Sequence, residues 1–147
     1  MSFLLDSNTC IQFLNRRSEP LIRRLTDTPD EEILVCSVVK AELFFGARKS
    51  RDPQRSRQVQ ERFFERYSSL PFDDEAALTY ADIRAHLERA GTPIGSNDLL
   101  IASIARSHDL VFSGCHDRGE DGSFTRRRMS VRGEFRAALG DTKPKPM

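Results

Sequence analysis

The sequence has 147 residues, of which 38% are hydrophobic and 31% are charged. This length suffices for one domain with a hydrophobic core. No apolar run approaches the ~18–20 residues of a membrane helix, and no basic stretch followed by an apolar one begins the chain, so we expect neither a membrane span nor a secretory signal. The cysteines Cys10, Cys36 and Cys115 are too few and too scattered for a disulfide framework or a zinc knuckle, which favours a reduced, cytoplasmic protein.

The net charge of +1 is unevenly distributed along the chain. Residues 1–113 carry 15 Lys and Arg against 17 Asp and Glu, a net charge of −2. Residues 114–147 carry 8 against 5, a net charge of +3, and the two parts sum to +1. A basic excess at one end gives slight support to a polyanionic partner.

Three short apolar runs predict buried strands: Phe3–Leu5, Ile33–Cys36 and Leu110–Phe112. A further extended segment, Leu70–Phe72, contains Pro71, which places it at a sheet edge or in an irregular strand. Apolar residues at helical spacing predict helices between these runs, after Ser7–Thr9 and over Pro20–Leu25, Val38–Phe45, Pro53–Tyr67, Asp73–Leu87 and Asp98–Ser107. Strands separated by helices predict an α/β fold with a parallel sheet and helices on both faces.

The periodic pattern ends after Ser113. Glycines interrupt the segment that follows, Arg126–Arg128 form a basic run, and two prolines and two lysines occupy the last seven residues. We therefore expect a domain core over residues 1–113 and a divergent C-terminal segment over 114–147 that ends in a disordered basic, proline-containing tail.

Three acids stand in apolar surroundings. Asp6 directly follows a predicted strand, Glu42 lies within an apolar helix, and Asp98 opens another apolar helix after a Gly/Pro loop. Each has an ordinary structural explanation: Asp6 as a helix cap, Glu42 as a solvated helix residue, and Asp98 as a favourable charge at a helix N-terminus. Gathered at strand ends and helix starts, however, the three would need a compensating cation. An all-oxygen ligand set favours Mg²⁺ or Mn²⁺ over zinc.

Three segments carry a family resemblance: Phe3–Asn8 (FLLDSN), Cys36–Gly46 (CSVVKAELFFG) and Gly91–Ala102 (GTPIGSNDLLIA). In sequence, order and spacing they resemble the signature blocks of PIN-domain ribonucleases, in particular the VapC-like toxins of type II toxin–antitoxin pairs. The resemblance covers residues 2–113, and the blocks are specific as a set.

The resemblance implies a PIN-like α/β/α sandwich with a small parallel sheet. It implies that Asp6, Glu42 and Asp98 are catalytic acids that hold Mg²⁺ or Mn²⁺, with Ser7 or Asn8 as the small polar neighbour of the first acid. It further implies an RNA substrate, a VapB-like antitoxin partner and a homodimer. The residues that bind RNA, and the RNA that is cut, are not identified by it.

The sequence departs from the family pattern after the last predicted strand. The family usually has a fourth acid or an asparagine there, in a motif that ends in phenylalanine, whereas this chain reads SGCHDRGED over Ser113–Asp121. Asp117 is the nearest acid to the expected place and is the candidate fourth metal ligand.

Seven cations fall within nineteen residues, from Arg48 to Arg66. They suit either a phosphate-binding surface or, as we expect, a solvated helix face with charge pairs. The aromatic pairs Phe44–Phe45 and Phe63–Phe64 are expected in the core or in a dimer contact rather than as base-stacking platforms.

The leading hypothesis is a metal-dependent endoribonuclease toxin. The altered C-terminus keeps open a catalytically impaired PIN-like module that binds RNA or a protein. A receiver-like domain also clusters acids at strand ends, but it needs a lysine after a late strand, and none closes the Leu110–Phe112 run.

Overall fold

The computed structural model describes residues 2–113. The C-terminal segment expected from residue 114 onward, including Asp117 and Cys115, lies outside the described residues. The described elements are β1 (Phe3–Leu5), α1 (Ser7–Leu14), α2 (Glu19–Asp27), a 3-10 turn (Asp30–Glu32), β2 (Ile33–Cys36), α3 (Ser37–Arg48), α4 (Pro53–Glu65), β3 (Ser68–Leu70), α5 (Asp74–Ala90), α6 (Ser96–Ser107) and β4 (Val111–Ser113).

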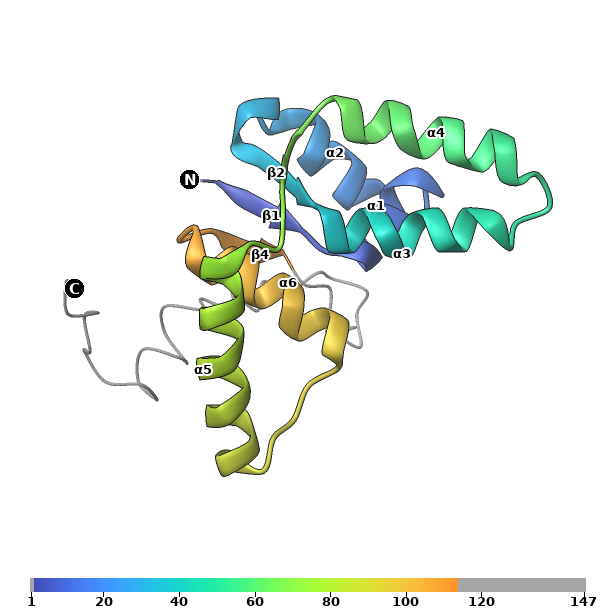
Figure 1. Ribbon diagram of the computed structural model, residues 1–147. Helices are drawn as coiled ribbons and strands as arrows, with labels where there is room; N and C mark the ends of the chain where they lie inside the picture. The colour runs from blue at the N-terminus through green and yellow to red at the C-terminus, as the bar shows by residue number, and fades with distance from the viewer. Residues whose placement is uncertain (1, 114–147) are drawn as a thin grey trace.

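Four parallel strands form the sheet, in the order β3-β2-β1-β4. Phe3 pairs with Ile33 on one side and with Val111 on the other. From β1 the chain moves to β2 and then β3 on one side, and it returns to place β4 on the opposite side of β1. Crossover connections of parallel strands are right-handed, so the two directions of winding put helices on opposite faces. Figure 1 shows α1–α4 on one side of the sheet and α5 and α6 on the other.

The α/β sandwich with a small parallel sheet is therefore confirmed. The core lies between the sheet and both helical layers, with β1 and β2 at its centre. Leu4 and Val35 are fully buried, as is Ile104 of α6, and on the other face Phe63 and Phe64 of α4 join the core. The central strands β1 and β2 consist of apolar residues, as expected for strands that are covered on both faces.

Two boundaries differ from the sequence-based expectation. The edge strand is Ser68–Leu70 rather than Leu70–Phe72, and it pairs with β2 in the register Leu34 with Ser68 and Cys36 with Leu70. Pro71 has no N–H to donate to a ladder, so the strand ends before it. The position at the sheet edge is confirmed.

The second difference is at the end of α3: the helix predicted over Val38–Phe45 continues through Gly46 to Arg48. Gly91, in contrast, does end its helix, because it adopts a left-handed conformation with φ of 69° at the C-cap of α5. No described helix is both long and apolar enough to cross a membrane.

Candidate functional site

Asp6 lies at the point where the winding of the sheet reverses. It follows β1, whose neighbours β2 and β4 are reached in opposite directions. In open parallel sheets, ligands bind outside the carboxyl ends of the strands at this switch point. Asp6 is only 6% exposed, and its Oδ1 accepts a hydrogen bond of 2.8 Å from the backbone N–H of Thr9. The residue thus caps α1 and stands at the ligand-binding edge at the same time.

The cap does not exhaust this carboxylate. Two oxygens offer about four lone-pair sites, and the N-cap bond with Thr9 uses one of them. The two explanations of Asp6 that the sequence left open are therefore compatible, because one side chain can cap the helix and still bind a cation.

Glu42 contacts Ser7, the residue that follows Asp6. The Oγ–H of Ser7 donates a hydrogen bond to Oε2 of Glu42, joining the start of α1 to the middle of α3. Glu42 is half-buried, at the border between the buried and the solvent-facing sides of α3. Of the two polar candidates beside Asp6, Ser7 makes this contact, and Asn8 is exposed. The hydrogen bond brings the second acid to the residue adjacent to the first.

Asp98 approaches the same edge of the sheet from the other helical layer. It lies in the first turn of α6 and is exposed, and no side chain caps this helix at Gly95. Because α6 leads directly into β4, it runs antiparallel to the strands, and its N-terminus is at their carboxyl ends. α6 also packs against α3, the helix that carries Glu42. Asp98 therefore belongs to the same edge, although it also complements the helix dipole.

The three acids share an edge but do not form one closed group. Within residues 2–113, no three His, Cys, Asp or Glu side chains lie close enough together to hold a metal ion. The structure joins Asp6 and Glu42 through Ser7 and leaves Asp98 as the separate, exposed member. The donor set itself, three carboxylates and a hydroxyl, suits Mg²⁺ or Mn²⁺.

The thiols beside these acids are not candidate ligands or nucleophiles. Burial raises the pKa of the Cys10 thiol above its ordinary value of 9.0, and the negative charge of Asp6 raises it further. Burial likewise raises the pKa of Cys36, at the end of β2. Both residues are fully buried, so both remain neutral thiols at physiological pH.

Comparison with known proteins identifies the family of the chain. Residues 3–114 match the PIN domain family. The chain is 39% identical over 111 residues to the tRNA(fMet)-specific endonuclease VapC of Salmonella typhimurium, covering 76% of this chain and 83% of that protein. It is 34% identical to the ribonuclease VapC2 of Haemophilus influenzae strain Rd, with the same coverage of both chains.

Solved structures give the same result. The DNA-bound VapBC complex of Salmonella typhimurium contains a chain that superposes with a TM-score of 0.71 at 38% identity, covering 76% of this chain and 84% of that one. VapBC-1 of nontypeable Haemophilus influenzae gives a TM-score of 0.68 at 30% identity, covering 76% and 84%. The chain therefore belongs to the PIN-domain family, in its VapC group.

Proposed function

We propose that this protein is a Mg²⁺-dependent endoribonuclease that acts as the toxin of a toxin–antitoxin pair. The observation that carries the proposal is the hydrogen bond to Glu42 from Ser7, the residue next to Asp6, at the switch point of the sheet. The relatives named above support it, because each carries a nuclease name. These names give no support to the alternative of a catalytically impaired module that binds RNA or a protein.

In this proposal, Asp6, Glu42 and Asp98 hold the metal, which is Mg²⁺ or, alternatively, Mn²⁺. A divalent ion held there would supply Lewis-acid stabilisation of a phosphoryl oxygen and a more acidic bound water; attack by that water on phosphorus would break the P–O bond to the leaving ribose oxygen, which takes up a proton. The cap bond to Thr9 fixes the side chain of Asp6, and the hydroxyl of Ser7 fixes that of Glu42. A ligand that is held by a second interaction loses less conformational entropy when it binds the ion.

The exposed position of Asp98 suggests a distinct role for that acid. Asp6 is fixed by burial and Glu42 by its hydrogen bond, whereas the carboxylate of Asp98 faces solvent at the start of α6. It can reach a cation that the other two hold, at the side from which RNA enters. In this role, Asp98 is the third carboxylate ligand and completes the metal site.

The partners follow from the same family. The structures it resembles are VapBC complexes, so we propose a VapB-like antitoxin as the inhibitor, with a homodimer of the toxin and a cytoplasmic location. One relative is named for its action on tRNA(fMet), which makes this tRNA the first substrate to test.

The test is cleavage of initiator tRNA and of total RNA by the purified chain, with Mg²⁺, with Mn²⁺ and with EDTA. Asp6→Asn, which preserves the cap, is the matched inactive control. We expect the parent to cleave RNA with Mg²⁺ or with Mn²⁺. We expect no cleavage in EDTA, and none by Asp6→Asn with either ion. Cleavage that persists in EDTA, or in Asp6→Asn at the parent rate, would contradict the proposed metal site.

A further inference from the structure

The solvent-facing side of α3 continues from the proposed site toward the end of the α3–α4 hairpin. Lys49, the C-cap residue of α3, lies seven residues after Glu42, and Gly46 lies four residues after it. At 3.6 residues per turn all three share one face, and Lys49 is about 10 Å further along the axis. Phe45, Gly46 and Lys49 are exposed, whereas Glu42 is half-buried at the border of this face. We call Phe45, Gly46 and Lys49 the α3 face.

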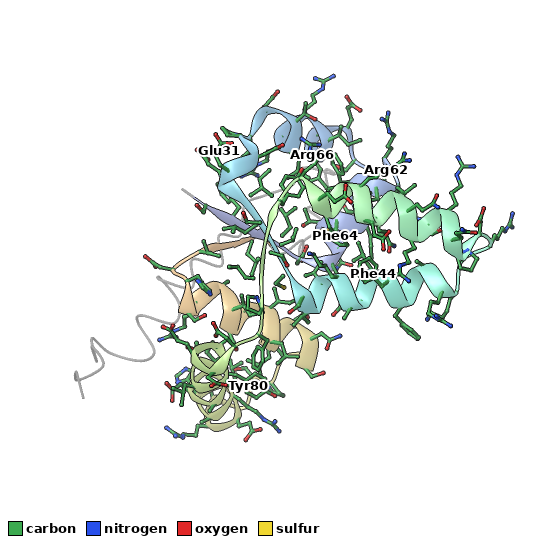
Figure 2. The ribbon with its side chains drawn as sticks, turned by 45° about the horizontal axis from the view of Figure 1, so that its top comes forward. Glu31, Phe44, Arg62, Phe64, Arg66 and Tyr80 are labelled. Carbon is green, nitrogen blue, oxygen red and sulfur yellow. The ribbon has the colours of Figure 1, made fainter. Side chains whose placement is uncertain are left out.

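Phe45 is an exposed aromatic ring with a cation over it. Its side chain is 62% exposed, and Nζ of Lys49 lies 4.4 Å from the ring centroid. The adjacent Phe44 makes the contacts that hold α3 to α4, with its ring 5.7 Å from that of Phe64, and Figure 2 shows these two rings between the helices. Of the two places expected for this pair, the core or a dimer contact, Phe44 takes the first, whereas the exposed Phe45 is not part of the core. Lys49 covers one face of the ring, and the other face is available to a base.

Gly46 has no structural reason to be glycine. It lies in the interior of α3, and a Cβ atom added there would meet nothing within 4 Å. Glycine inside a helix is less stable than alanine, because the unfolded chain has more conformational freedom. What glycine provides here is bare backbone between Glu42 and Lys49, where an external molecule can approach the helix closely.

The hairpin end concentrates positive charge. Residues 47–58 contain five cations, Arg48, Lys49, Arg51, Arg55 and Arg57, and one acid, for a net charge of +4. The other residues of 1–113 contain ten cations and sixteen acids, a net charge of −6. Figure 1 shows the hairpin projecting beyond the end of β1 that leads into α1. The basic end thus lies on the same side of the sheet as the proposed site.

Most of these cations are not neutralised within the protein. Arg57 pairs with Glu61 at 2.9 Å. Arg48, Arg51 and Arg55 form no ion pair with any residue in the described part of the chain. The charge pairs that the sequence favoured are present at Arg57 and at Arg66, which pairs with Asp30. Arg48, Arg51 and Arg55 are solvated, as expected, but add positive charge that no such pair within residues 2–113 offsets.

We propose that the α3 face binds single-stranded RNA next to the phosphate that is cut. Lys49 and the hairpin end bind its phosphates, Phe45 stacks on a base, and Gly46 lets the strand pass close to the helix on its way to Glu42. The combination of an open ring with surrounding cations suits a polyanion with aromatic bases. A protein partner would instead need further apolar surface around Phe45, where Gly46, Arg48 and Lys49 lie. This inference rests on the proposed ribonuclease function.

The test measures binding of a fluorescein-labelled 20-nucleotide single-stranded RNA by anisotropy, with the full chain, at low and moderate salt. The variants are Phe45→Ala, Gly46→Ala and Lys49→Gln. Matched controls come from α5: Leu78→Ala removes another exposed apolar side chain, and Arg89→Gln another exposed cation. Cleavage of the same RNA by the active protein is measured in parallel.

We expect Phe45→Ala to weaken binding roughly 5- to 100-fold. Lys49→Gln should weaken it several-fold and lower the salt dependence by about one phosphate contact. Gly46→Ala should raise the melting temperature yet weaken binding, a combination that a purely structural role does not give. In cleavage, the three variants should raise KM more than they lower kcat, and the α5 controls should match the parent.

If the parent binds and cleaves RNA while all three variants bind within twofold of it, the α3 face is not the subsite and the ribonuclease proposal stands. If the parent neither binds nor cleaves any RNA, both proposals fail. If Phe45→Ala abolishes a dimer in light scattering while RNA affinity is unchanged, the face belongs to a second copy of the chain, and the RNA subsite is refuted.

Discussion

Replacing Asp6 by asparagine and by alanine separates its two roles, cap and metal ligand. Asparagine caps helices as well as aspartate does, whereas alanine does not. Thr9, whose backbone N–H donates the cap bond to Asp6, is 4% exposed, so alanine at position 6 removes the acceptor of a buried donor. Loss of such a cap costs about 0.5–2 kcal/mol. We therefore expect Asp6→Ala to unfold about 1 kcal/mol more easily than the parent, and Asp6→Asn to stay within about 0.5 kcal/mol of it.

The assay is urea and thermal unfolding in EDTA, repeated with Mg²⁺. For a chain of this size, 1 kcal/mol corresponds to a shift of roughly 2–6 °C in melting temperature. Because a metal that binds only the folded state stabilises it, Mg²⁺ should raise the melting temperature of the parent and of neither variant. If Asp6→Asn is as unstable as Asp6→Ala in EDTA, the cap argument is wrong. If Mg²⁺ stabilises both variants as it does the parent, Asp6 is not a ligand.

Three further predictions concern the remaining groups of the site. Ser7→Ala should lower activity and Mg²⁺ affinity, because it removes the hydroxyl that donates a hydrogen bond to Glu42. Glu42→Gln should lower both more strongly, while it changes the free energy of unfolding by less than about 1 kcal/mol. If Glu42→Gln is as active as the parent, Glu42 is not part of the site. Asp98→Asn should abolish cleavage but lower stability by only about 0.3–1 kcal/mol at low salt, because the residue is exposed in a first helical turn; a larger loss would indicate a structural role. The buried thiols Cys10 and Cys36 have raised pKa values, so the folded state keeps protons that the unfolded state loses above about pH 9. The free energy of unfolding should therefore fall as the pH rises past that value, by up to about 1.4 kcal/mol per pH unit for each thiol. Urea titrations at several pH values should show a less steep fall in Cys10→Ala.

The sequence predicted correctly the strands that consist of buried apolar residues. β1 and β2 begin and end at their predicted residues, and the acid that follows β1 is where a parallel sheet binds ligands. The edge strand was misplaced because its pairing depends on β2, and Ser68 and Ser69 carry no apolar signal of their own. An edge strand that is covered on few sides needs no apolar run.

Which side chains of the site face inward depends on how each helix is rotated about its own axis. A short sequence pattern does not determine that rotation. Neighbouring residues of a helix point about 100° apart. That angle separates Ser7, which meets Glu42, from Asn8, which is exposed, and it separates Phe44 from Phe45. Which member of each pair faces inward was decided by the packing of α1 and α4 against α3.

The sheet order has a consequence for the time at which this protein becomes active during its synthesis. β1 is completed on both sides only when β4 pairs with it, and their partners Phe3 and Val111 are 108 positions apart. Contacts this distant in sequence form late, because the whole intervening chain must first be made and its ends brought together. A ribosome that has made α1 through α4 holds Asp6 and Glu42 but neither Asp98 nor the strand that completes the sheet. If the proposed site needs all three acids, most of the chain is made before it could cleave RNA, which leaves time for the proposed antitoxin to be present when β4 docks.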